Sequence, residues 1–204
     1  EIEALGVRCI RLTAHLAEAE QVQKLFKAVN DEFGRLDILI NNAASGVQRS
    51  AMKLEEKHWD WTMDINTKAP WLCAQAAVPL MEQGGQGGRI VNISSLGSGR
   101  VFPYYLSVGV SKAGLEAVTR YLAIELAPKG ITVNAVSGGY VATEALEHFP
   151  NADDMFNIAK SKTPGDQLLT PSDLAKTVAF LCSDDAAMIR GQVIVVDGGM
   201  SLPL

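Results

Sequence analysis

The sequence predicts an α/β fold built on a doubly wound parallel sheet, with helices on both faces. Short apolar runs typical of buried strands alternate along the chain with segments whose apolar residues recur at helical spacing. Such alternation is typical of βαβ units around a parallel sheet. The chain has 204 residues, the size of one domain, and no linker, internal repeat or low-complexity tract divides it. We therefore expect a single domain over residues 1–204.

Five segments are predicted to be strands. Each is a short run rich in apolar residues, and several open into small polar residues, as a buried parallel strand does at its carboxyl end. The segments cover residues 7–13, 37–40, 89–95, 130–136 and 192–197.

Four segments are predicted to be helices. Apolar residues before Gly34 fall at helical spacing, and Gly34 closes that helix. Two longer helices are expected over residues 56–81 and 105–126. Thr170 is a candidate N-cap with Pro171 at the first helical position, so a further helix should begin there.

The composition excludes several function classes. A net charge of −5 gives no electrostatic reason to expect nucleic acid or an anionic membrane as partner. No apolar run approaches the roughly 18 residues of a membrane span. Cys9, Cys73 and Cys182 form no C-x-x-C pair, and the three histidines lack metal-ligand spacing. We expect no disulfide framework, no metal and a cytoplasmic location.

Small and polar residues follow several of the predicted strands. Ligands of open parallel sheets bind in the crevice at the carboxyl ends of the strands, so these residues are candidates for a site. They are Asn41 and Asn42 with Ala43 and Ala44, then Ser94 and Ser95, and then Gly138 and Gly139 followed by Thr143.

Tyr105 and Lys112 are the most informative pair. Seven positions turn a helix by about 700°, so both side chains are expected on one helix face, whereas Tyr104 would point roughly 80° away. A nearby ammonium lowers the pKa of a phenol and makes it a better proton donor. Ser95 offers a second hydrogen-bond donor for a substrate oxygen. An isolated pair of this kind is usually a packing aromatic beside a surface charge, but these two accompany several further motifs.

Those motifs together resemble the short-chain dehydrogenase/reductase family. The resemblance implies a Rossmann-type sheet, a nicotinamide cofactor and a catalytic set of Asn66, Ser95, a tyrosine and Lys112. In order along the chain the motifs are Asn41-Asn-Ala-Ala, Asn66, Ile90-Val-Asn-Ile-Ser-Ser, Tyr105 with Lys112, Val133-Asn-Ala-Val and Asp197-Gly-Gly.

The tyrosine departs from the usual pattern of that family. Most members have Tyr-x-x-x-Lys, but Val108 stands four residues before Lys112. The spacing of Tyr105 and Lys112 resembles the enoyl-thioester reductase branch, and further segments, including Val136-Ser-Gly-Gly, resemble the bacterial NADPH-dependent enoyl-acyl carrier protein reductases of type III. The resemblance implies NADPH-dependent reduction of a trans-2-enoyl thioester in fatty acid elongation, with acyl carrier protein as partner. The alternatives are a carbonyl- or alcohol-type family member and a non-catalytic member or fragment.

Roles follow from the resemblance residue by residue. Tyr105 would stabilise the enolate oxygen, Ser95 would supply a second donor, and Lys112 would hold the nicotinamide ribose and tune Tyr105. Asn66 would support Lys112 through water, and residues 140–165 would form a mobile lid over an acyl channel. The candidate cofactor-binding residues are Asn42, Ala43, Lys112, Val141, Thr143, His15 and Leu16.

Assembly is predicted from the two long helices. Both are apolar on more than one side, which favours a second packing partner, and relatives form tetramers through these helices. We therefore expect a homo-oligomer, a tetramer by resemblance. The residues concerned are Trp71, Leu72, Val78, Leu80, Leu115, Val118, Leu122 and Ile124.

The start of the chain predicts a missing segment. The chain begins without Met and opens like the last turn of a helix closed by Gly6. If residues 7–13 were the third strand of the usual order 3-2-1-4-5-6, the first strand-helix-strand unit and its glycine-rich pyrophosphate loop would be absent. We expect residues 1–204 alone to bind NADPH poorly, to lack activity and to aggregate through an open sheet edge.

Overall fold

A parallel four-stranded sheet forms the centre of the protein, as predicted. The computed structural model describes residues 2–141, 157 and 160–202. The strand order is β1-β2-β3-β4, and every neighbouring pair is parallel. The strands are β1 (Ile38–Asn41), β2 (Gly88–Ser95), β3 (Ile131–Gly138) and β4 (Val193–Val196). Ser95 lies beside Gly138 in the register, so the carboxyl ends of β2 and β3 are level.

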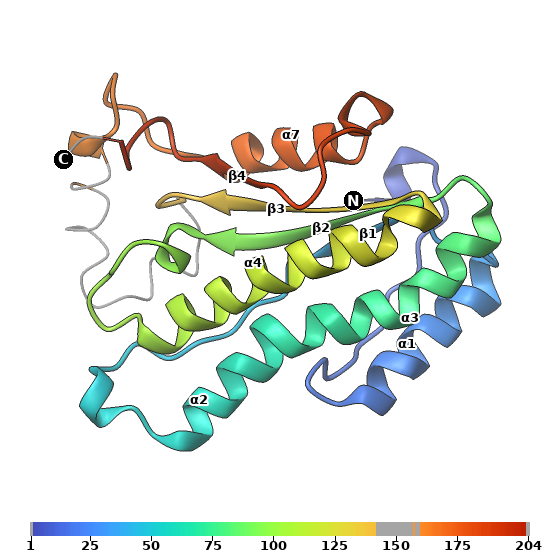
Figure 1. The fold of residues 1–204 in the computed structure, drawn as a ribbon, viewed down its shortest axis with the longest axis horizontal. Helices are drawn as coiled ribbons and strands as arrows, with labels where there is room; N and C mark the ends of the chain where they lie inside the picture. Colours follow the sequence, from blue (N-terminus) through green and yellow to red (C-terminus); the bar gives the residue numbers. More distant parts are fainter. Residues whose placement is uncertain (1, 142–156, 158–159, 203–204) are drawn as a thin grey trace.

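Helices cover both faces of this sheet (Figure 1). On one face lie α1 (Ala19–Phe33), α3 (Ala69–Gly84) and α4 (Leu106–Leu126), and the other face carries α7 (Pro171–Leu181). The helix α2 (Glu56–Met63) leads into α3. The doubly wound α/β fold is therefore confirmed. Short 3-10 turns complete the described elements at η1 (Glu3–Leu5), η2 (Ala51–Lys53), η4 (Leu96–Ser98), η5 (Ala127–Lys129) and η6 (Asp184–Ala186).

Each face of the sheet has its own hydrophobic core. Ile90 and Val133 are buried with Met81 beneath α1, α3 and α4. Their neighbours along the strands point the opposite way, and Val91 and Val136 are buried under α7. Successive strand residues therefore face two apolar layers, which explains why the central strands read as continuous apolar runs rather than as alternating ones.

The local signals for helix ends are confirmed. Gly34 follows α1 in the left-handed conformation with φ 71°, and its N–H donates to the carbonyl of Asn30. At the start of α7, the side chains of Thr170 and Asp173 form a reciprocal capping box. These motifs fix helix boundaries locally, which is why the sequence alone located them.

The helix predicted over residues 56–81 contains a turn of π-helix. This turn, η3 (Asp64–Lys68), separates α2 from α3 and includes Asn66. Pro70 has no N–H with which to bond the carbonyl four residues earlier, so the regular ladder is interrupted there. A widened turn of this kind commonly occurs at functional sites.

Two sequence-based predictions were wrong: one strand and the first residue of one helix. Residues 7–13 form no strand, because a strand needs a neighbour to pair with and no described strand lies alongside them. The helix predicted from Tyr105 begins instead at Leu106. Tyr104 has φ 63°, a left-handed conformation that no right-handed helix contains, and Tyr105 follows it at the N-cap with φ −109°.

The structure bears on the membrane and metal predictions only where it describes the chain. Among residues 2–141, 157 and 160–202, no helix is long and apolar enough to span a bilayer. The same residues contain no group of three or more His, Cys, Asp or Glu side chains arranged to hold a metal ion.

Candidate active site at the carboxyl end of the sheet

Ser95 and Tyr105 meet at the carboxyl end of β2. Ser95 is the last residue of β2 and Tyr105 immediately precedes α4, yet their hydroxyl oxygens lie 3.3 Å apart. Ser95 Oγ also accepts a hydrogen bond from the N–H of Gly97, which fixes its direction. Two hydroxyls held side by side can both donate to one substrate oxygen, the arrangement expected for stabilising developing negative charge.

Glycines bring the two segments close enough for this contact. A Cβ on Gly97 would overlap the Tyr105 ring, and a Cβ on Gly109 would lie 2.7 Å from the carbonyl oxygen of Gly97. Only hydrogen at these positions lets the first turn of α4 rest on η4. The Ser95–Tyr105 distance therefore depends on Gly97 and Gly109.

Replacing Gly97 by Ala should displace the Tyr105 ring while leaving the fold intact. Because a misplacement of about 1 Å in a catalytic group can cost around 100-fold in rate, we expect kcat to fall about 10- to 100-fold. The matched control is Gly99→Ala, since a Cβ there meets nothing within 4 Å. Steady-state kinetics of both variants would check this, and equal rates would show that Gly97 does not position Tyr105.

Lys112 is buried in the same region. It is 5% exposed, and its ammonium donates to the carbonyl oxygen of Ile93 at 2.7 Å. Burial lowers the pKa of Lys112 to about 8. An ammonium has three N–H donors, and within the described part of the chain Lys112 uses one of them. The remaining donors are available to hydroxyl groups of a bound molecule.

The pKa of Tyr105 differs from the expectation. Burial raises it, and the hydrogen bond with Ser95 opposes the rise only in part. The predicted lowering by Lys112 is therefore wrong, because removal of the phenol from water dominates. The argument from a shared helix face also fails in detail, since Tyr105 lies before the first helical turn. A phenol that stays protonated at neutral pH still acts as a hydrogen-bond donor.

Activity that depends on the Lys112 ammonium should decline as the pH rises through about 8. Stability should respond in the opposite direction. The folded-state pKa lies below the usual 10.5, so the unfolded chain binds more protons between these values. Unfolding free energy attributable to Lys112 therefore increases with pH across that window. Profiles of kcat/KM and of denaturation from pH 6.5 to 10 would test both, and a flat rate profile would contradict the role of the ammonium.

Asn66 makes direct hydrogen bonds to two other segments of the chain. Its side-chain oxygen accepts from the N–H of Ser45 at 2.8 Å, and its amide donates to the carbonyl of Ser45 and to Ser111 Oγ, at 2.8 and 2.9 Å. Ser111 adjoins Lys112 in α4. Asn66 thus ties the loop after β1 to the helix that carries Lys112, with no direct bond to the ammonium.

Val108 occupies the position at which most family members carry their tyrosine. Its side chain abuts Gly46, so closely that a Cβ on Gly46 would overlap Val108 Cγ2. The space beside α4 at this turn is therefore filled by Val108 and the backbone of the loop after β1. Tyr105, one turn earlier, is the tyrosine that reaches Ser95.

Glu116 is a residue that the sequence interpretation missed. Ser94 Oγ and Ser98 Oγ both donate to Glu116 Oε1 at 2.6 Å. Ser94 and Ser98 flank Ser95 on β2 and η4, while Glu116 lies one turn beyond Lys112 on α4. The carboxylate therefore fixes the segment that carries Ser95 to α4. No local signal in the sequence marks this role of Glu116, because its partners Ser94 and Ser98 lie 22 and 18 residues away along the chain.

The predicted cofactor-binding residues lie in several places. Asn42 and Ala43 are exposed directly after β1, at the carboxyl edge of the sheet. Val141 follows β3 and pairs in parallel with Leu169. Thr143 lies outside the described residues, as does most of the predicted lid over 140–165.

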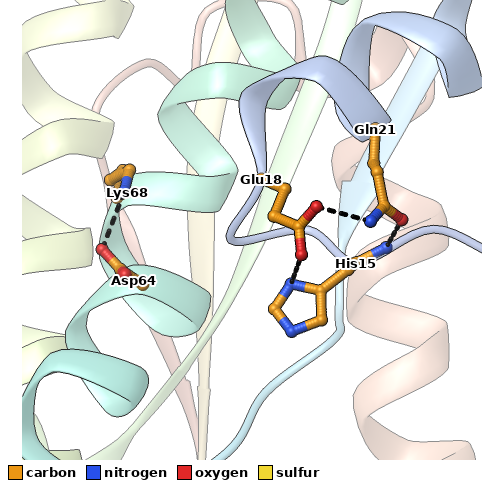
Figure 2. Close-up of polar contacts among 5 residues, drawn as sticks. All are labelled: His15, Glu18, Gln21, Asp64 and Lys68. Atoms are coloured by element: carbon orange, nitrogen blue, oxygen red, sulfur yellow. Dashed lines mark hydrogen bonds and ion pairs between the residues drawn. The ribbon is translucent and has the colours of Figure 1, made fainter. Parts of the chain in front are cut away.

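His15 and Leu16 lie near the start of α1. His15 donates its backbone N–H to Gln21 Oε1 at 2.6 Å, Gln21 donates to Glu18 at 2.7 Å, and the imidazole lies 3.8 Å from the same carboxylate (Figure 2). The His15 ring also packs edge-on against Trp61, with centroids 5.1 Å apart. Leu16 packs against the core beneath α1. Figure 2 also shows the Asp64–Lys68 pair within η3.

Two of the sequence motifs have structural roles. The side chain of Asn134 bridges β3 to the start of β4, accepting from the N–H of Gln192 and donating to the carbonyl of Ile189. Asp197 accepts from the N–H groups of Gly199 and Ser201 and so closes the turn after β4. These contacts join β3 to β4 and close the turn after β4, and neither involves Ser95, Tyr105 or Lys112.

The chain is similar to known oxidoreductases over nearly its whole length. A family model described as enoyl-(acyl carrier protein) reductase matches residues 1–201. The 1-cyclohexenylcarbonyl-CoA reductase of Streptomyces collinus is 39% identical over 99% of this chain and 72% of its own length. The chain belongs to the short-chain dehydrogenase/reductase family. The 3-oxoacyl-acyl-carrier-protein reductase FabG of Staphylococcus aureus is 36% identical over 98% of the chain and 80% of its own length.

A solved structure supports this membership of the short-chain dehydrogenase/reductase family. It is described as a short-chain alcohol dehydrogenase from Sinorhizobium meliloti. The two structures superimpose with a TM-score of 0.93 at 36% sequence identity, and the match covers 100% of this chain and 80% of the other. The protein is thus an oxidoreductase of a family that uses nicotinamide cofactors. The names of its relatives include both a CoA-thioester reductase and a 3-oxoacyl reductase, so the family leaves open which double bond is reduced.

Proposed function

We propose that the protein reduces the carbon–carbon double bond of a trans-2-enoyl thioester with NADPH, as an enoyl-acyl carrier protein reductase does. The observation that carries the proposal is the position of the phenol: Val108 fills the usual tyrosine position, and Tyr105 contacts Ser95 from one turn earlier. In carbonyl reduction the hydride goes to the carbon that bears the oxygen. In enoyl-thioester reduction the oxygen lies three bonds from the β-carbon, two bonds further than in a carbonyl, and a displaced donor suits that geometry.

The residues of the site would then act on the thioester oxygen. Tyr105 and Ser95 donate hydrogen bonds to it as negative charge develops, and burial of Tyr105 keeps its phenol protonated for this purpose. When bound, the cofactor supplies the hydride to the β-carbon. Glu116 holds the segment around Ser95 through Ser94 and Ser98. The resulting enolate would then take a proton from solvent at its α-carbon, which gives the saturated thioester.

The residues at this edge of the sheet fit a nicotinamide nucleotide. Lys112 presents a buried ammonium with N–H donors beyond the one used on Ile93, which suits the hydroxyls of a ribose. Exposed Asn42 and Ala43 would border the adenosine ribose, and Val141 and Thr143 the nicotinamide side. Preference for NADPH over NADH rests on the resemblance and on the acyl carrier protein reductases among the relatives.

The apolar surface that α3 and α4 offer for assembly is smaller than the sequence suggested. Of the eight apolar residues that were noted on these two helices, Val78, Leu80 and Leu115 belong to the buried core. Trp71 and Ile124 are exposed, and Tyr121 adds a further exposed ring on α4. We propose that α3 and α4 meet a second copy through this smaller set, in a cytoplasmic homo-oligomer that accepts acyl carrier protein thioesters.

A spectrophotometric assay of NADPH oxidation tests the proposed reaction. We expect the full-length protein to oxidise NADPH with a crotonyl thioester and to be at least about tenfold less efficient with an acetoacetyl thioester, as kcat/KM. The reverse preference would instead establish 3-oxoacyl reduction. That alternative is favoured by the similarity to FabG, and the Ser95–Tyr105 pair could also polarise a ketone.

A further inference from the structure

An aromatic cluster adjoins the Ser95–Tyr105 pair. Phe102, in the loop between β2 and α4, lies between two tyrosines: its ring centroid is 5.7 Å from that of Tyr105 and 5.3 Å from that of Tyr140. The planes are inclined at 80° and 46°, so the rings meet edge-on and tilted rather than stacked. Tyr140 belongs to the segment after β3, so two separate loops build this cluster.

The aromatic cluster has a rigid support. Leu96 and Met200 are buried, and Phe102 and Tyr140 pack against them. Gly97 leaves room for the rings, since a Cβ there would overlap Tyr105 and approach Phe102 at 3.4 Å. Phe102, Tyr105 and Tyr140 are each only partly buried. The rings therefore keep some exposed surface while their backbone side is packed.

Tyr140 lies close enough to Tyr105 for the two phenols to interact electrostatically. Burial raises the pKa of Tyr140, and the charge that Tyr105 would carry raises it further. Both tyrosine rings also pack against Phe102, so Tyr140 belongs to the same group of rings as the catalytic phenol. The aromatic cluster thus extends from the oxygen-binding pair itself.

We infer that this cluster selects enoyl thioesters in which a six-membered ring is joined to the reacting double bond. The inference rests on the proposed function, which places the thioester oxygen against Tyr105 and Ser95. Because the β-carbon is only three bonds from that oxygen, its substituent would lie beside Tyr105 and within reach of the aromatic cluster. Aromatic groups favour centroid separations of about 4.5–7 Å in edge-on or offset arrangements, the range already used within the cluster. A ring also has few rotatable bonds to immobilise, whereas a linear chain must lose the freedom of several.

The test compares two substrates of equal carbon number, cinnamoyl-CoA and trans-2-nonenoyl-CoA. We expect the full-length protein with NADPH to show a kcat/KM about tenfold higher for cinnamoyl-CoA. Phe102→Leu and Tyr140→Leu, which keep an apolar side chain but remove the ring, should each reduce this ratio at least about threefold. Tyr140→Phe should preserve it, because the ring and not the hydroxyl makes the contact.

Tyr104→Leu serves as the matched control. Tyr104 is 61% exposed and belongs to neither the cluster nor the catalytic pair, so its replacement should leave the ratio unchanged. A wild-type ratio of one or less, or a ratio unaltered in both leucine variants, would overturn the inference while leaving enoyl reduction standing. Failure to reduce either thioester, with the protein folded and binding NADPH, would overturn the proposed function and this inference with it.

Discussion

Tyr105→Phe should lower kcat by about 100- to 1,000-fold, the usual cost of removing one donor to a developing oxyanion. Only the hydroxyl is lost, so the ring should keep its contact with Phe102 and the fold should be unchanged. Affinity for NADPH should stay within about twofold, because the phenol contacts the substrate oxygen. Single-turnover kinetics with a crotonyl thioester would measure the chemical step, and fluorescence titration would measure cofactor binding.

Tyr104→Phe is the control for this result. The two tyrosines are adjacent, but Tyr104 is exposed and has the left-handed backbone that turns the chain into α4. Removing its hydroxyl keeps that backbone, and we expect little change in kcat. If Tyr104→Phe were the damaging variant and Tyr105→Phe the mild one, the assignment of the phenol to Tyr105 would be wrong.

Lys112→Met should impair both turnover and cofactor affinity. The ammonium is the buried cation of the site, and a hydrogen bond to a charged group contributes about 1.5–3 kcal/mol. We therefore expect NADPH to bind about 10- to 100-fold more weakly, together with a drop in kcat of similar size. Titration calorimetry and steady-state kinetics would separate the two effects.

The fold should survive this substitution, because two effects on stability oppose each other. The carbonyl of Ile93 loses its partner, at a cost of about 1–3 kcal/mol, while the cost of burying an ammonium disappears. Circular dichroism should thus report a folded variant. Normal NADPH affinity in that folded variant would show that Lys112 does not hold the ribose.

The sequence predicted those parts of the fold that depend on local chemistry. Apolar runs located β1 to β4, and Gly34 and the Thr170–Asp173 capping box marked helix ends, because each signal acts within a few residues. Residues 7–13 have a similar local character, but none of the strands that the structure describes lies beside them, and pairing is a property of the whole sheet. Strand propensity alone therefore misled the prediction for that segment.

In the candidate site, too, the sequence indicated single residues but not the contacts that depend on packing between distant segments. The order of motifs along the chain predicted Ser95, Tyr105 and Lys112 as site residues. In the structure the hydroxyl groups of Ser95 and Tyr105 are in contact. The direction of the Tyr105 pKa shift was mispredicted because it depends on how much water the surrounding loops exclude. Tyr140 and Glu116 were missed because their relation to the site exists only after β3 and α4 have packed against β2.

The central claim, reduction of a carbon–carbon rather than a carbon–oxygen double bond, has one direct test. Full-length protein would be given equal concentrations of crotonyl and acetoacetyl thioesters with NADPH that carries deuterium at the transferred position. Mass spectrometry would then report where the label goes in direct competition. The account predicts deuterated butyryl thioester as the main product, and deuterated 3-hydroxybutyryl thioester in its place would contradict it.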